Sequence, residues 1–159
     1  MMKKVLLLIA IVFVLIQFIR PEKNIKILGS ASFIGNQYTV SDTINAILKK
    51  SCFDCHSNRT NYPWYSTIQP FAWWLNNHVK DGKRKLNFDE FLSYTVNKQD
   101  HKLEELIETQ QENLMPLKSY TLIHGEAKLS QEERQLLINW AQDLRSTIQR
   151  NPSFIKNKN

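Results

Sequence analysis

Glycine, proline and cysteine are scarce in this chain, and each shortage disfavours a class of structure. Four glycines and five prolines occur among 159 residues, which argues against an all-β fold built on many tight turns. The two cysteines cannot form the disulfide framework of a small secreted domain. We therefore expect an all-α fold, in a chain whose length fits one domain with appendages.

Acidic residues are outnumbered, and the chain carries a formal charge of +6. Positions 1–26 hold five basic residues and one acidic residue, a net +4, which leaves sixteen basic and fourteen acidic residues, a net +2, elsewhere. Because the positive charge belongs mainly to the N-terminal segment, we expect no nucleic-acid partner. A local cluster at Lys80, Lys83, Arg84 and Lys85 indicates a solvated loop or, alternatively, a docking patch for an acidic redox partner or anionic lipid.

An apolar run opens the chain. Val5 to Ile16 contains no polar residue, and after Gln17 the run continues to Ile19 before Arg20 ends it. The pattern is typical of a signal sequence, and because no small-residue cleavage site follows directly, it predicts an uncleaved anchor over residues 1–20. As a helix the 15 residues from Val5 to Ile19 would cover roughly 22 Å, against about 30 Å for the hydrocarbon core.

The pentapeptide Cys52-Phe53-Asp54-Cys55-His56 is the most informative part of the sequence. The spacing Cys-x-x-Cys-His is typical of c-type haem attachment, in which two thiols form thioether bonds to one haem. The histidine that follows is then an axial ligand of the iron. The motif predicts one covalently attached haem c, with Cys52 and Cys55 as attachment points and His56 as the proximal ligand.

Two other interpretations of the cysteine pair are weaker. A thioredoxin-like dithiol would follow a strand, whereas a helical pattern precedes Cys52. Half of a zinc site would need two more ligands at suitable spacing, and the chain has no further cysteine. Attachment of haem to cysteines takes place outside the bacterial cytoplasm, so the motif also predicts a haem domain on the periplasmic side of the inner membrane.

The remainder of the chain divides into three parts. Residues 21–39 are predicted to be a stalk with apolar residues that can pack on the domain, residues 40–150 the haem domain, and 151–159 a polar tail. Within the domain, Ser41 is the expected N-cap of the helix that leads into the motif, and residues 57–70 form a loop. Further helices are expected from Phe71, from Asp89, over Asp100–Glu112, and after a capping box at Ser130 and Glu133. The last helix is expected to bury Leu136, Leu137, Trp140 and Leu144.

The sixth ligand of the iron is the open question. Met115 precedes Pro116, and a residue before proline is driven out of the helical region, so its thioether would be presented from extended chain. Met115 is the first candidate, although methionine also fills core gaps. His78 and His124 are the alternatives, and His101 is expected at the surface.

Aromatic residues are frequent after the motif, and most are expected in the core. Arg59, Trp64 and Tyr65 are predicted to donate hydrogen bonds to the haem propionates. A backbone carbonyl within residues 61–70 is expected to orient the ring of His56, because metal-bound histidines need such a partner.

Beyond the pentapeptide, the sequence resembles the small bacterial haem-binding-domain proteins, relatives of monohaem cytochrome c, over roughly residues 40–145. The resemblance implies haem attachment at Cys52 and Cys55 and proximal ligation by His56. It is carried by Cys-Phe-Asp-Cys-His-Ser-Asn-Arg-Thr-Asn-Tyr-Pro-Trp-Tyr at 52–65, His78, Gly82, Leu86-Asn87-Phe88, Met115-Pro116-Leu117, Tyr120, His124, Ala127-Lys128-Leu129-Ser130 and Trp140.

Three functions follow as hypotheses. The first is a membrane-anchored monohaem cytochrome that transfers single electrons to an unknown redox partner, since a His/Met pair keeps the iron six-coordinate. The second is a haem-based sensor or ligand-binding module with a displaceable sixth ligand. The third, an enzyme of the peroxidase type, would need a distal acid-base residue, for which His78 and His124 are the candidates.

Overall fold

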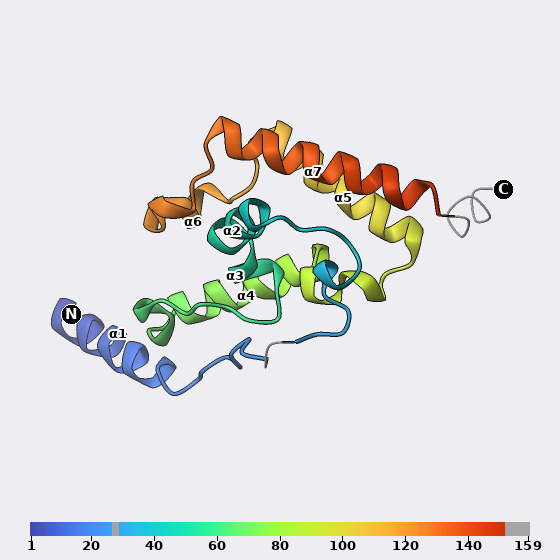
Figure 1. Ribbon diagram of the computed structural model, residues 1–159. Coiled ribbons are helices and arrows are strands. Elements are labelled where there is room, and N and C mark those ends of the chain that lie inside the picture. The colour runs from blue at the N-terminus through green and yellow to red at the C-terminus, as the bar shows by residue number, and fades with distance from the viewer. Residues whose placement is uncertain (27–28, 152–159) are drawn as a thin grey trace.

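Helices make up the regular structure of the chain, as the composition predicts. The computed structural model describes residues 1–26 and 29–151 (Figure 1). Over these residues it contains no strand, only one isolated bridge between Ile25 and Arg59. The helices are α1 (Met2–Ile16), η1 (Ile34–Asn36), α2 (Asp42–Ser51), α3 (Phe53–His56), η2 (Trp64–Thr67), α4 (Phe71–Lys85), η3 (Phe88–Ser93), α5 (Val96–Gln111), α6 (Lys118–Ile123), η4 (Gly125–Ala127) and α7 (Gln131–Gln149).

The first helix, α1, stands apart from the rest of the molecule, and none of its residues is buried (Figure 1). It ends at Ile16, three residues before the end of the apolar run. In the part of the chain that the structure describes, no helix is both long and apolar enough to cross a membrane.

The segment that follows α1 packs against the domain along α4. The Asn24 side chain donates to the carbonyl of Ser57 at 2.9 Å and to Oγ1 of Thr60 at 3.0 Å. The Lys26 amide donates to the carbonyl of Asn58 at 3.0 Å. Ile34 is fully buried in the core. The predicted stalk is thus largely a packed segment, as its apolar residues suggested.

The core lies between α2, η3, α5 and α7. Ser41 caps α2 as predicted, accepting a hydrogen bond from the amide of Ile44, and the inward face of α2 is buried. The Phe88 and Phe91 rings of η3 are buried beneath it. Since Phe53 contacts the Phe88 ring edge-on at 5.6 Å, the core reaches directly to α3.

The two longest core helices, α5 and α7, run side by side in opposite directions (Figure 1). The Arg145 guanidinium of α7 binds both carboxylate oxygens of Asp100, at 2.9 and 3.2 Å, and Glu104 at 2.9 Å. Paired Arg–carboxylate bonds fix geometry as well as contributing energy. They set the register between the two helices.

Helix α7 begins as predicted but turns a slightly different face to the core. Both bonds of the capping box at Ser130 and Glu133 are present. Leu137 and Leu144 are buried, whereas Leu136 is 43% exposed and Trp140 is only partly buried. The prediction for Leu136 was wrong, because Ile138 and Ala141 occupy the inward stripe beside Leu137.

Several predicted boundaries shift as well. Helix α5 starts at Val96 rather than at Asp100, because Thr95 caps it. The stretch from Asp89 is the short helix η3, and the 57–70 loop contains η2. Helix α6 was not predicted. Of the predicted polar tail, residues 152–159 lie outside the described part of the chain.

Replacing Leu137 by alanine should lower the free energy of unfolding by about 2–5 kcal/mol, because the truncation leaves a cavity in the core. Its neighbour supplies the control: Leu136→Ala should change stability by less than about 0.5 kcal/mol. Urea unfolding of the haem-loaded variants, followed by circular dichroism, measures both. Equal losses would contradict the helix face described here.

Candidate haem site

The pentapeptide forms the short helix α3 immediately after α2. Cys52 separates the two helices with a backbone conformation outside the helical region, and its carbonyl accepts hydrogen bonds from the amides of Cys55 at 3.1 Å and His56 at 2.9 Å. One turn of chain therefore brings Cys52, Cys55 and His56 to the same side. All three line one cavity.

That cavity has a volume of about 140 Å³ and is open to solvent. Residues 51–56, 78–85 and 115–120 supply its walls. Cofactor sites typically combine apolar walls with a few placed polar groups. Two thiols, two imidazoles and one thioether meet here, and this donor set fits a haem group.

The ring of His56 is fixed by the backbone at the end of α4. Its Nδ1 lies 2.9 Å from the carbonyl oxygen of Leu86. Since a carbonyl only accepts, Nδ1 carries the proton and Nε2 keeps a free lone pair, the form in which histidine binds a metal. Burial lowers the pKa of His56, while hydrogen bonding to the Leu86 and Gly82 carbonyls opposes the shift.

This orienting carbonyl was expected within residues 61–70, and that expectation was wrong. The 61–70 loop contacts α3 through the amide of Asn61, which binds Asp54. The carbonyl that faces Nδ1 of His56 comes instead from the end of α4. Leu86 is the first residue after α4, so its carbonyl is no longer needed by the helix.

Helix α4 approaches α3 unusually closely at Gly82. A Cβ atom at this position would lie 2.6 Å from the backbone oxygen of Cys55. Real Cβ atoms do not approach a carbonyl oxygen so closely, so glycine is required for α4 to form this wall of the cavity.

Both thiols remain protonated in the chain itself. Burial raises the pKa of Cys52 to about 12, and the neighbouring Cys55 thiol adds to the shift. Burial and the carboxylate of Asp54 raise the pKa of Cys55 to about 11. Since the thiolate is the reactive form, the two sulfurs are protected from unwanted oxidation and alkylation at neutral pH.

Met115 lies in non-helical chain, as its position before Pro116 predicts, and it lines the cavity. Helix α5 ends at Gln111, and Asn113 adopts a left-handed conformation with φ 55°. Nη1 of Arg134 binds the carbonyl of Met115 at 2.7 Å. The backbone of this loop is therefore bound to α7, while the Met115 side chain lines the cavity.

The three remaining histidines occupy different settings. His78 lines the cavity, with Nδ1 2.8 Å from the carbonyl of Trp74, which leaves Nε2 as a potential ligand. His101 is exposed beside Glu104 and Glu105, as expected. His124 is not part of the cavity wall, and its two ring nitrogens lie 2.8 Å from the Tyr65 hydroxyl and 3.1 Å from Glu126.

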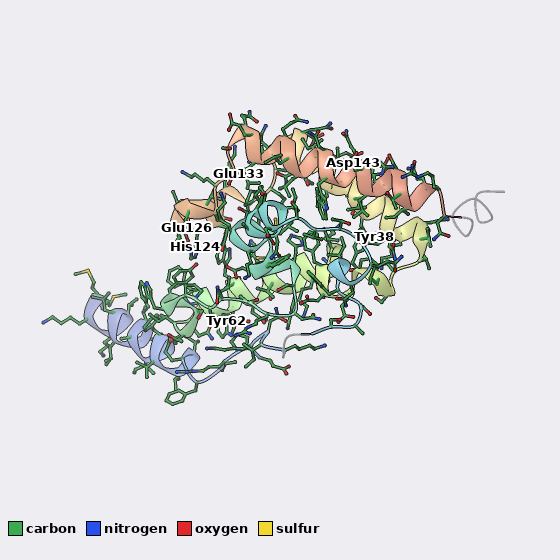
Figure 2. The ribbon with its side chains drawn as sticks, in the orientation of Figure 1. Tyr38, Tyr62, His124, Glu126, Glu133 and Asp143 are labelled. Carbon is green, nitrogen blue, oxygen red and sulfur yellow. The ribbon has the colours of Figure 1, made fainter. Side chains whose placement is uncertain are left out.

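Helix α6 forms the remaining wall through Tyr120, which sequence reasoning did not place in the site. The Tyr120 hydroxyl donates to Oδ2 of Asp54 at 2.7 Å, and the ring stacks on His124. Figure 2 labels His124 next to Glu126, whose carboxylate lies 3.1 Å from Nδ1 of His124. Burial, with the hydrogen bond to Asp54, raises the pKa of Tyr120. Asp54 also accepts the amide of Asn61 at 3.0 Å. The residue between the two cysteines thus joins α3 to α6.

The structure does not bring Arg59, Trp64 or Tyr65 to the cavity wall. The backbone of Arg59 pairs with Ile25, Trp64 is exposed, and the Tyr65 hydroxyl is engaged by His124. Lys85 and Ser51 line the cavity instead and can interact with propionates.

The cavity therefore combines two thiols and a thioether with an oriented imidazole. The model of the haem-binding domain matches residues 11–143 of the chain. The chain belongs to the haem-binding-domain family. It binds haem, and the matched region includes the segment 21–39 as well as α2 to α6. No curated protein and no solved structure matches the chain.

Gly82→Ala should destabilise the haem-loaded protein and reduce the fraction of chains that carry haem. Overpacking against a backbone atom costs about 1–3 kcal/mol, which exceeds the gain of about 0.8–1 kcal/mol that alanine brings to a helix. Thermal unfolding and the ratio of haem to protein absorbance measure the effect. Gly125→Ala is the control, since no atom lies within 4 Å of its Cβ position; the close approach of α4 to α3 is refuted if both variants behave alike.

Proposed function

We propose that this protein is a monohaem c-type cytochrome that transfers single electrons, with the haem bound covalently through Cys52 and Cys55. The support is their spacing on one turn of chain at the wall of one cavity. Each thiol adds across a vinyl double bond, the sulfur to one carbon and the hydrogen to the other, so attachment needs no oxidant. The bound group supplies a reversible one-electron change at its iron.

His56 and Met115 are the proposed axial ligands. The hydrogen bond to Leu86 prepares Nε2 of His56 for the iron, and the hold of Arg134 on the Met115 backbone keeps the thioether near the cavity. Thioether ligation favours a high reduction potential, and a protein that supplies both ligands limits rearrangement when an electron arrives. This arrangement is the main support for electron transfer.

We further propose that α1 anchors the protein in the bacterial inner membrane, with the haem domain on the periplasmic side. None of its residues is buried by the rest of the chain. A helix that is apolar on all sides needs apolar surroundings, and two lysines lie at its N-terminal end. The haem domain is placed on the periplasmic side because haem is attached to cysteines outside the bacterial cytoplasm.

Covalent attachment predicts that haem stays with the polypeptide under denaturing conditions. In Cys52→Ser or Cys55→Ser one thioether bond is lost, so the absorption bands of the reduced haem should move toward those of a haem that retains one vinyl group. Haem-stained denaturing gels and pyridine haemochrome spectra measure this. The double variant is expected to release its haem into acidified organic solvent, and retention there would contradict the proposal.

A second function, a ligand-binding sensor, is favoured by one observation. His78 also lines the cavity, and its Nε2 is free because Nδ1 faces the Trp74 carbonyl. Two candidate distal groups at one cavity allow ligand exchange. Such a sensor would release one of them when a diatomic gas binds.

Met115→Ala separates the two functions. For an electron carrier, the variant should lose the far-red band of a methionine–iron bond in the oxidised state, its reduction potential should fall, and its ferrous form should bind carbon monoxide at least tenfold faster than the parent. His124→Ala is the control and should leave the spectrum unchanged, because His124 lies outside the cavity wall. Rapid carbon monoxide binding by the unaltered protein would favour the sensor instead.

A further inference from the structure

An unusual concentration of exposed apolar side chains lies at one end of the haem domain. Trp64 is 78% exposed, Phe71 52%, Leu122 85% and Ile123 54%. They come from η2, from the first residue of α4 and from the last two residues of α6. We call these four residues the apolar end.

The buried ring of Tyr65 brings these residues together. Its ring meets those of Trp64 and Phe71 edge-on, at centroid distances of 6.0 and 6.4 Å. Its hydroxyl lies 2.8 Å from Nε2 of His124, the residue that follows Ile123. Segments far apart in the sequence thus lie on one side of the molecule, where α6 and the start of α4 are found (Figure 1).

Helix α1 leaves the domain from this same end, and hydrogen bonds fix its junction. The Gln69 amide donates to Oε1 of Gln17 at 2.9 Å, and the Gln17 side chain returns a bond to the carbonyl of Gln69 at 3.3 Å. The Gln69 side chain and the Trp73 indole both donate to the carbonyl of Ile19, at 2.8 and 3.0 Å. Gln69 is 1% exposed and stands two residues before Phe71.

These polar groups satisfy one another rather than relying on water. Backbone and amide groups close to a hydrocarbon layer need internal partners, since lipid offers none. Tryptophan, with an apolar ring and one polar N–H group, is enriched where a membrane meets water. Both the junction and the apolar end therefore suit the edge of a bilayer.

We propose that the apolar end is a lipid-binding surface, which seats the haem domain directly on the bilayer that receives α1. The inference rests on the proposed anchoring of α1 and goes beyond it, because a domain anchored only by α1 need not contact the membrane itself. A lipid bilayer is the occupant that the surface fits, because the apolar end adjoins α1 through the hydrogen-bonded junction, and no residue of α1 is buried. On this arrangement the membrane contacts η2 and α6 as well as the anchor.

Photolabelling of the full haem-loaded chain tests the surface. The protein is reconstituted into phosphatidylcholine–phosphatidylglycerol vesicles that contain an acyl-chain diazirine lipid, irradiated, and mapped by mass spectrometry. Label is expected on α1 and severalfold above background on Trp64, Phe71, Leu122 and Ile123. Leu136 on α7 is a 43% exposed leucine outside the apolar end and should remain unlabelled.

The outcomes distinguish the two proposals. Label on α1 alone would leave the anchor intact and overturn the lipid-binding surface. Label on neither would overturn both. Label on Leu136 equal to that on the apolar end, or cross-linked dimers of the chain in place of lipid adducts, would also overturn the surface.

A matched pair of variants adds a second test. Trp64→Glu combined with Leu122→Glu should lower labelling of η2 and α6 severalfold while labelling of α1 persists. Leu136→Glu should leave the whole pattern unchanged. The haem absorbance spectrum verifies that each variant is folded, and unchanged labelling in a folded double variant would contradict the proposal.

Discussion

The close contact between α3 and α4 is the constraint on which the haem site depends. Gly82 lets α4 approach the carbonyl of Cys55 to a distance that no side chain permits. That approach brings the Leu86 carbonyl to Nδ1 of His56. The same helix places Gly82, Lys85 and His78 along the cavity. The position of α4, the tautomer of His56 and one wall of the cavity therefore all follow from this contact between two backbones.

The opposite wall is held by polar bonds at separate points. Tyr120 binds Asp54, and Arg134 binds the carbonyl of Met115. The first bond joins the short helices α3 and α6, and the second joins the loop around Met115 to α7. Edge-on contact between Phe53 and Phe88 connects α3 to the main core on its other side, so α3 is held by α4, by α6 and by the core.

Sequence patterns that act within a few residues predicted the structure well, and long-range relations were missed. The caps at Ser41 and Ser130 and the break at Met115 are local effects of hydrogen bonding and sterics. By contrast, the partners of His56 and Asp54 lie 30 and 66 residues away, and no local pattern marks a backbone carbonyl as a partner. Leu136 was misplaced because two adjacent leucines leave the rotation of a helix undetermined until the facing helix is known.

Helix α6 connects the candidate haem site to the proposed lipid-binding surface. Tyr120 faces the haem cavity and binds Asp54, while Leu122 and Ile123, one turn or less further on, are exposed at the apolar end. A helix of six residues has little stability of its own, so its position depends on what holds both of its faces. A bilayer against the outer face would restrain α6 against the cavity, and membrane seating would thereby stabilise the distal wall of the haem site.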